Sequence, residues 1–200
     1  MIRIVIAEDQ AMLRGALSTL LGLEDDMEVA AEAVDGNEAL EYVRRIKPDV
    51  LITDIEMPGR SGIDLAELIR RDQLPTRVLI VTTFSRPGYL QRALNAGVSG
   101  YVLKDTSSDE LADAVRTVHQ GGRYVPAELA ELAWTAPDPL TDRERQVLRL
   151  AESGLQNKQI ATELGLSVGT VRNYITEAMS KLQASNRVEA FRMARDLGWL

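Results

Sequence analysis

IRIVIAED, residues 2–9, opens the chain with a short β-branched run that ends on two acids. VLITD, residues 50–54, has the same form, with four mostly apolar residues followed by an aspartate. A short apolar run of this kind is expected of a strand buried on both faces of a parallel sheet. These two stretches therefore predict neighbouring strands whose carboxyl ends carry acids.

The rest of the first 120 residues alternates strand-like and helix-like segments around these two runs. The predicted strands are residues 2–7, 29–33, 50–53, 77–82 and 100–103, and the predicted helices are 11–23, 36–46, 61–71, 88–96 and 109–120. Strands that alternate with helices indicate an α/β fold, here a doubly wound five-stranded parallel sheet. Ligands of such sheets bind beyond the carboxyl ends of the strands.

A break in this pattern falls at residues 121–137, where glycines and prolines interrupt the periodicity. This segment is the predicted linker between a domain of residues 1–120 and a domain of residues 138–200, with one or two helical turns expected over 128–134. Only helix signals follow, with helices expected up to residue 153 from a capping box, then over 157–164, 168–182 and 187–197. Asn157 and Ser167 are the expected caps of the middle two.

The second domain contains a helix, a tight turn and a helix, with Gly165-Leu166-Ser167 as the turn. That order is typical of a helix-turn-helix, whose second helix reads DNA. An ordinary helical bundle fits the spacing alone equally well. The spacing alone therefore does not decide between a helix-turn-helix and an ordinary helical bundle.

Composition excludes several classes of protein. The 200 residues are 45% hydrophobic and 26% charged, which is ordinary for a globular chain, and they include no cysteine and a single histidine, His119. Disulfides, thiol nucleophiles and histidine-rich metal sites are therefore excluded. We expect a cytoplasmic protein without membrane insertion, because no apolar run approaches the ~20 residues of a membrane span. Residues 1–120 carry 13 basic and 20 acidic residues and the rest is neutral, which indicates two modules.

Three carboxylates, Glu8, Asp9 and Asp54, should converge at one edge of the sheet. Clustered acids repel one another unless a cation neutralises them, and an all-oxygen set suits Mg²⁺ or Mn²⁺. Thr82 and Lys104 end two further strands and could bind a phosphoryl group. Each residue alone fits a helix cap or a solvated side chain, but together they predict an aspartyl phosphoryl-acceptor site.

Residues 1–120 also resemble a receiver domain of the two-component response regulators. The resemblance is carried by Ile6–Asp9, Asp54–Gly59, Val81–Thr83 and Gly100–Lys104. It implies that Asp54 accepts a phosphoryl group from a sensor histidine kinase. It also implies that Glu8, Asp9, Asp54 and the backbone carbonyl of Glu56 hold Mg²⁺, that Thr82 and Lys104 contact the phosphoryl group, and that Tyr101 is the aromatic switch residue. Asp105 departs from the proline that many receivers have after the lysine.

Residues 138–195 resemble the effector domain of the NarL/FixJ or LuxR-type regulators, on Leu140–Leu148, Asn157–Ala161 and Gly169–Tyr174. The resemblance implies a transcription regulator that binds double-stranded promoter DNA. Arg172, Asn173 and Thr176 would face the bases, and Lys158, Thr170 and Lys181 would contact phosphates. Many members have lysine where this chain has Thr176. Residues 21–29 and 83–93 further resemble a subgroup that regulates a fatty-acid desaturase gene.

Two alternatives and one assembly question stay open at this point. A magnesium-dependent aspartyl phosphatase would need a second aspartate two residues after the nucleophile, where this chain has Glu56. A receiver that dimerises and binds DNA without phosphate is the other alternative. We expect a homodimer formed on phosphorylation, through either the first and last receiver helices or the fourth helix, fifth strand and fifth helix. The first is preferred because Met12 and Leu13 lie beside the acids.

Overall fold

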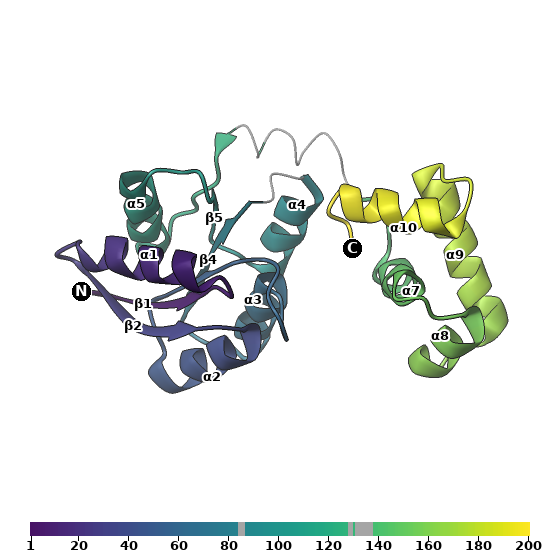
Figure 1. The fold of residues 1–200 in the computed structure, drawn as a ribbon, viewed down its shortest axis with the longest axis horizontal. Coiled ribbons are helices and arrows are strands. Elements are labelled where there is room, and N and C mark those ends of the chain that lie inside the picture. The colour runs from purple at the N-terminus through teal and green to yellow at the C-terminus, as the bar shows by residue number, and fades with distance from the viewer. Residues whose placement is uncertain (84–86, 128–129, 131–137) are drawn as a thin grey trace. The chain divides into compact units, whose positions relative to one another are not determined.

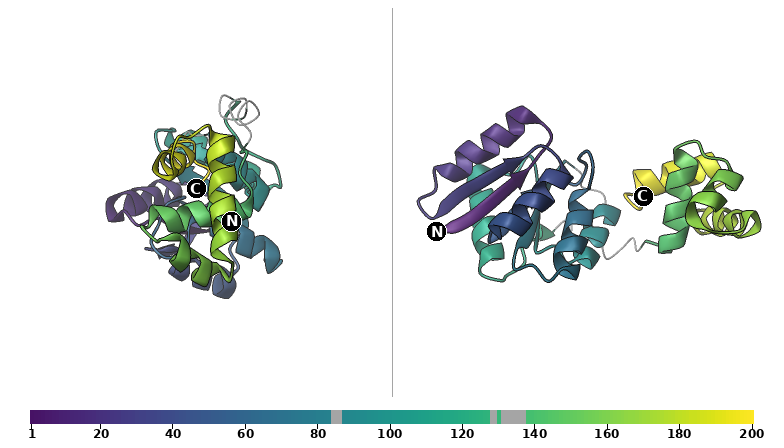
Figure 2. Two further views of the ribbon diagram at one scale, coloured as in Figure 1. Left: turned by 90° about the vertical axis from the view of Figure 1, so that its right-hand side faces the viewer. Right: turned by 90° about the horizontal axis from the view of Figure 1, so that it is seen from below.

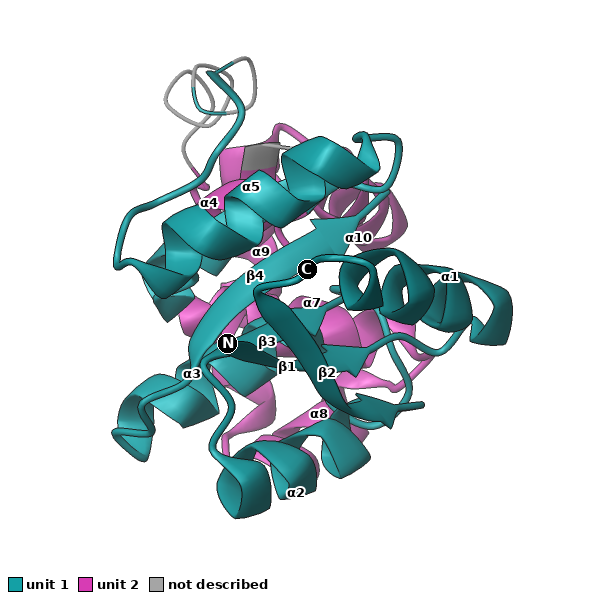
Figure 3. Ribbon diagram, turned by 90° about the vertical axis from the view of Figure 1, so that its left-hand side faces the viewer, with its two compact units in different colours: residues 1–85, 92–131 teal, residues 86–91, 132–200 magenta. Residues whose placement is uncertain are grey.

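The computed structural model describes residues 1–83, 87–127, 130 and 138–200. The chain divides into two compact units, residues 1–85 with 92–131 and residues 86–91 with 132–200, and each is described by itself (Figures 1 and 3). Apart from Ala130, the helical turns expected over 128–134 lie outside the described residues. The domain boundaries expected at residues 120 and 138 stay predictions.

Five parallel strands form the sheet of the first unit, in the order β2-β1-β3-β4-β5. They are β1 (Ile2–Ala7), β2 (Met27–Ala33), β3 (Val50–Thr53), β4 (Arg77–Thr82) and β5 (Gly100–Leu103). β1 and β3 are direct neighbours, and Ala7 lies opposite Thr53. The doubly wound parallel fold predicted from the sequence is therefore confirmed.

Strand β2 begins two residues earlier than predicted. Ile2 pairs with Met27, so all six residues of β1 have partners on β2. The exposed Glu28 interrupts the apolar pattern there, so hydrophobicity alone did not predict the first two residues of the strand.

Helices cover both faces of the sheet, with α1 and α5 on one face and α2 and α3 on the other (Figures 2 and 3). Their bounds are α1 (Ala11–Gly22), α2 (Gly36–Ile46), α3 (Gly62–Arg71) and α5 (Ser108–His119), and α4 (Pro87–Ala96) contributes to both units. The side chains of α1 and α5 pack with those of β1, β3, β4 and β5 in one buried cluster. This packing fixes the strand ends that carry the predicted site.

The second unit is built from four described helices, α7 (Asp142–Glu152), α8 (Asn157–Leu164), α9 (Val168–Leu182) and α10 (Arg187–Asp196). Two buried clusters pack against the same side of α9, one along its first half and the other along its second half. The cap expected at Asn157 was placed one residue late. Gln156 is the extended residue before α8, and its N–H donates to the Gln159 side chain at 2.8 Å, so Asn157 is the first helical residue.

Candidate functional site

The acids of the first unit lie where three backbone hydrogen bonds extend the strand pairing beyond the strand ends. The N–H of Glu8 donates to the carbonyl of Ala33, and that of Asp54 donates to the carbonyl of Ala7, each at 3.1 Å. On the far side, the N–H of Lys104 donates to the carbonyl of Thr82 at 2.9 Å. The sheet itself thus holds these side chains at one edge.

Lys104 binds both buried carboxylates. Its Nζ lies 2.8 Å from Glu8 Oε2 and 2.8 Å from Asp54 Oδ2. Backbone donors take the other oxygen of each acid, since Ile55 N–H donates to Asp54 Oδ1 at 2.6 Å and Gln10 N–H donates to Glu8 Oε1 at 3.2 Å. Two carboxylates that are almost fully buried therefore share one ammonium group.

The excess of carboxylates over ammonium groups affects the pKa values of both Glu8 and Lys104. Burial raises the pKa of the Glu8 carboxyl, and the hydrogen bonds from Lys104 and from the Gln10 backbone offset only part of that effect. Burial works against the charged form of Lys104, but its bonds to Asp54 and Glu8 outweigh burial and raise the pKa of the ammonium. The site therefore holds its lysine charged, while burial opposes the ionisation of Glu8.

Asp9 adds a third carboxylate to this edge. One oxygen from each of Glu8, Asp9 and Asp54 lies within 4.8 Å of the others, and Asp9 is exposed to solvent. Oxygen ligands with room for water are the donor set that Mg²⁺ takes in proteins, so these residues fit that ion. Glu56 is exposed, and its backbone carbonyl is the remaining predicted ligand.

Thr82 and Tyr101 are both fully buried at 0% exposure. Thr82 is the last residue of β4 and lies opposite Leu103 on β5, one residue before Lys104. Tyr101 lies on β5 opposite Ile80, and its side chain is buried. The peptide bond between Lys104 and Asp105 is trans, as are the other described peptide bonds.

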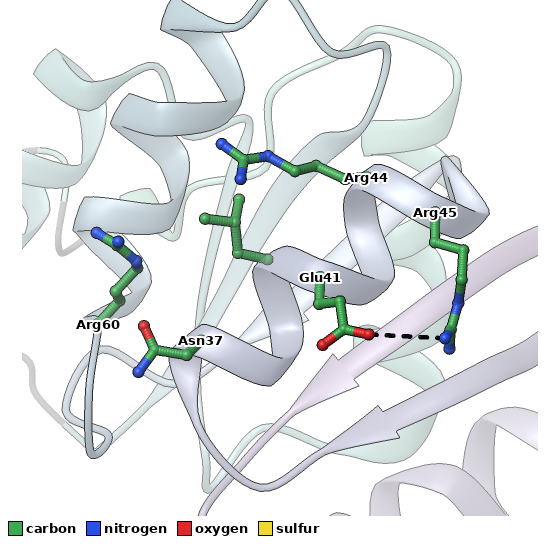
Figure 4. Close-up of a pocket in the computed structure, with 6 residues that line it drawn as sticks. Asn37, Glu41, Arg44, Arg45 and Arg60 are labelled. Atoms are coloured by element: carbon green, nitrogen blue, oxygen red, sulfur yellow. Dashed lines mark ion pairs between the residues drawn. The ribbon is translucent and has the colours of Figure 1, made fainter.

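A hollow of about 470 Å³ lies on the first unit over α2 (Figure 4). Arg44, Arg45 and Arg60 line it, together with Asn37, Leu40 and Glu41. Arg45 is turned toward Glu41, at 3.7 Å, and Arg44 is paired with Asp72 at 2.7 Å. The acidic site contributes no residue to this hollow.

The second unit presents α8, a turn and α9. Gly165 ends α8 at φ 65°, a conformation that favours glycine, and Ser167 caps α9 by accepting the N–H of Thr170 at 3.0 Å. Val171, Ile175, Ala178 and Leu182 bury one side of α9. The tight turn and the buried face leave the opposite side of α9 open.

Most residues predicted to contact DNA are exposed on this unit. Arg172, Asn173 and Thr176 lie on the open side of α9, Lys158 is exposed on α8, and Thr170 is half-buried at the start of α9. The described structure thus gathers the predicted base-facing residues along one helix.

Lys181 differs from the other predicted DNA contacts. Its Nζ lies 2.8 Å from both carboxylate oxygens of Glu144, which is only 1% exposed. Glu144 also accepts the N–H of Thr141 at 2.7 Å and so closes the capping box of α7. Burial works to raise the pKa of Glu144, but the bonds from Lys181 and Thr141 outweigh it and hold the pKa below its usual value. The sequence predicted the capping-box role of Glu144 but gave no sign that Lys181 is also its partner.

Comparison with known families decides the identity of both units. Residues 4–116 match the family described as the response regulator receiver domain, and residues 138–194 match the bacterial regulatory proteins of the luxR family. The chain belongs to the LuxR-family response regulators. It is therefore a DNA-binding response regulator of a two-component system, as the resemblances implied.

Relatives of this regulator match over its whole length. The transcriptional regulatory protein DesR of Bacillus subtilis (strain 168) is 50% identical over 199 residues, which cover 100% of this chain and 99% of DesR. The transcriptional regulatory protein UhpA of Escherichia coli (strain K12) is 41% identical over 202 residues and covers both chains fully. The structure of an RcsB–DNA complex has a TM-score of 0.67 at 25% identity over 98% of each chain.

In the part of the regulator that the structure describes, every helix is too short or too polar to cross a membrane.

Proposed function

We propose that this regulator controls transcription through phosphorylation of Asp54 by a sensor histidine kinase. The observation that carries the proposal is the charge balance at the sheet edge, where Glu8 and Asp54 are buried on one shared lysine and Asp9 lies beside them. Burying unbalanced charge is unfavourable unless a cation or a reaction uses it. An arrangement built only for stability would pair each buried acid with its own cation.

The chemistry assigned to the site is a phosphoryl transfer. A carboxylate oxygen of Asp54 attacks phosphorus, the bond from phosphorus to the donor breaks, and the donor leaves with the electron pair, as an imidazole from phosphohistidine or as acetate from acetyl phosphate. Lys104 and Thr82 then bind phosphoryl oxygens, and Tyr101 is the switch residue. Glu8, Asp9, Asp54 and the Glu56 carbonyl would hold Mg²⁺, which neutralises charge on the phosphoryl oxygens when bound.

The residues of this site argue against both alternatives, the aspartyl phosphatase and the dimer that forms without phosphorylation. An aspartyl phosphatase needs an acid–base aspartate where this chain has the exposed Glu56, and the relatives are named as transcriptional regulators. We therefore propose signalling rather than turnover. A dimer that ignores phosphate would have no use for the buried acids on Lys104.

The proposed dimer surface is the outer side of α1. Met12 is 90% exposed there and Leu23 is 74% exposed, with Ala16 and Leu20 also open between them. Leu13 instead packs against the core cluster and lines a small hollow that also includes Lys104. Of the two residues on which the preference for α1 rests, Met12 is thus the one free to meet a partner, and Leu13 connects α1 to the acidic site.

The decisive experiment is the intact mass of the full chain after incubation with acetyl phosphate and Mg²⁺. We expect one added phosphoryl group on the wild type, none on Asp54→Asn, and one on Asp49→Asn, a matched variant at the opposite end of β3. Uptake by Asp54→Asn would overturn the assignment. Continuous release of inorganic phosphate would favour the phosphatase.

Assembly and DNA binding are tested on the same phosphorylated samples. Sedimentation should show dimers of the wild type, monomers of Met12→Asp, and monomers of Thr82→Ala despite normal phosphoryl uptake.

The sequence of the selected duplexes should change for Arg172→Ala, because loss of a bidentate base contact costs ~1–3 kcal/mol at one position. A membrane-lipid gene is the proposed target, on the resemblance of residues 21–29 and 83–93, and selected duplexes should match the promoter of a fatty-acid desaturase gene.

A further inference from the structure

The open side of α9 carries small, uncharged side chains along its centre. Gly169, Asn173, Thr176 and Ser180 are all exposed and lie opposite the buried Val171, Ile175 and Ala178. In a helix-turn-helix this side of the second helix faces the base edges of the major groove. What each side chain can read there depends on the hydrogen-bonding groups that it has left.

Thr176 has already used its hydrogen-bond donor. Its hydroxyl donates to the carbonyl of Arg172, one turn earlier, at 3.0 Å. A threonine hydroxyl has a single hydrogen, so Thr176 cannot also donate to guanine O6 or N7 or to thymine O4. The groups that remain are its γ-methyl and the lone pairs of its oxygen.

The direction of that bond separates these two groups. The hydroxyl oxygen is turned toward the helix backbone, because it lies within hydrogen-bond distance of a main-chain carbonyl of the preceding turn. The γ-methyl diverges from the same Cβ and is directed away from that carbonyl. An apolar group on the exposed side of α9 has one apolar partner in the major groove, the C5 methyl of thymine.

We propose that Thr176 is a specificity-determining residue that selects thymine through contact between its γ-methyl and the C5 methyl of the base. The proposal rests on the assignment of α9 as the reading helix. Thr176 lies four residues after Arg172, about 6 Å along the axis, and base pairs are stacked about 3.4 Å apart. The thymine therefore lies within two base pairs of the base that Arg172 contacts.

Replacement of thymine by deoxyuridine tests the contact, because deoxyuridine pairs identically and lacks only the methyl group. The probe is a duplex selected from a random pool by the phosphorylated full chain, with each thymine replaced in turn. We expect one thymine per half-site at which the replacement weakens wild-type binding about fourfold, the effect of removing one buried methyl-sized group.

Two variants assign that loss to Thr176. Thr176→Ser keeps the hydroxyl and lacks the methyl, so it should bind the thymine and deoxyuridine duplexes equally well. Thr176→Val keeps a methyl and lacks the hydroxyl, so it should retain the fourfold preference. Ser180→Ala, on the same side of α9, is the matched control and should show the wild-type profile.

The remaining outcomes overturn the proposal in distinguishable ways. A preference for thymine over deoxyuridine that survives in Thr176→Ser would mean that another side chain contacts the thymine methyl group, and would overturn the proposal. A selected duplex that tolerates deoxyuridine at every position would overturn the methyl contact and still establish sequence-specific binding by this regulator. Failure to select any duplex would overturn the DNA-reading assignment itself, and the inference with it.

Discussion

Each half of the regulator holds a lysine against buried carboxylates, and the two arrangements differ in charge. Lys181 faces one acid, Glu144, and both oxygens of that acid bind its ammonium at 2.8 Å. Lys104 faces two acids, Glu8 and Asp54, with Asp9 beside them. The first arrangement is balanced and joins α7 to α9, whereas the second leaves excess negative charge, which suits the proposed Mg²⁺ site. The same kind of pairing thus stabilises one unit and, in the proposed function, belongs to a phosphoryl-acceptor site in the other.

The balanced pair should show the larger stability effect. Removing one partner of a buried ion pair costs about 3–5 kcal/mol, and we expect about 3 kcal/mol for Glu144→Ala because Lys181 keeps some contact with water. The variant also leaves the Thr141 N–H without its acceptor. Urea unfolding followed by Trp199 fluorescence, in a Trp134→Phe background, measures the loss. Glu163→Ala, an exposed acid on α8, is the control and should stay within about 0.5 kcal/mol of wild type.

The unbalanced cluster should instead respond to metal. A ligand that binds only the folded state at 100 times its dissociation constant adds about 2.7 kcal/mol of stability. We expect Mg²⁺ to stabilise the receiver by that amount, measured by far-UV circular dichroism in urea, and to leave the Trp199 transition in place. Asp54→Asn should reduce the gain, and chelation of the ion should abolish it. Equal stabilisation of both units would indicate a general ionic effect and contradict the comparison.

Lys181 lies between the two roles, since a phosphate contact was also predicted for it. Lys181→Met should lose about 2 kcal/mol of stability, because hydrogen bonds to a charged group disappear. If Lys181 also binds a backbone phosphate, the dependence of DNA affinity on salt should decrease by about one per subunit. Lys158→Met separates the effects, because we expect the same change in salt dependence with no loss of stability. An unchanged salt dependence in Lys181→Met would leave that lysine with a structural role alone.

The sequence was a good guide where a single residue type marks a structural position. Apolar runs placed β1, β3, β4 and β5 correctly, and the acids and lysine that follow three of them do meet at one edge. The family resemblance then agreed with this geometry.

The sequence was a poor guide to what lies across space. Glu144 was explained by its capping box, so nothing pointed to a lysine 37 residues away. Leu13 and Met12 are adjacent and equally apolar, but the rotation of α1 buries one in part and exposes the other at 90%. The hydroxyl of Thr176 is committed to Arg172 by a rotamer, which no pattern of residue types encodes.

The smallest expected effect is a change in stability with pH, and its sign should differ between the pair of Glu144 with Lys181 and the pair of Glu8 with Lys104. The pKa of Glu144 is held below its usual value, so the folded state keeps that acid ionised, and its stabilising contribution is lost as the pH falls below about 4.5. The pKa of Glu8 is raised by burial, so without metal its stabilising contribution is present at low pH and is lost as the pH rises through the folded-state pKa.

With Mg²⁺ chelated, lowering the pH from 6 to 4 should bring the stability of Glu144→Gln closer to that of the wild type, as measured by Trp199 fluorescence. The same change should make the wild-type receiver more stable relative to Glu8→Gln, by circular dichroism. The two changes should have opposite signs, because the pKa of Glu144 is lowered and that of Glu8 is raised. Shifts of the same sign in both units would mean that the two lysines balance their acids alike, and that the receiver has no excess negative charge for a cation to neutralise.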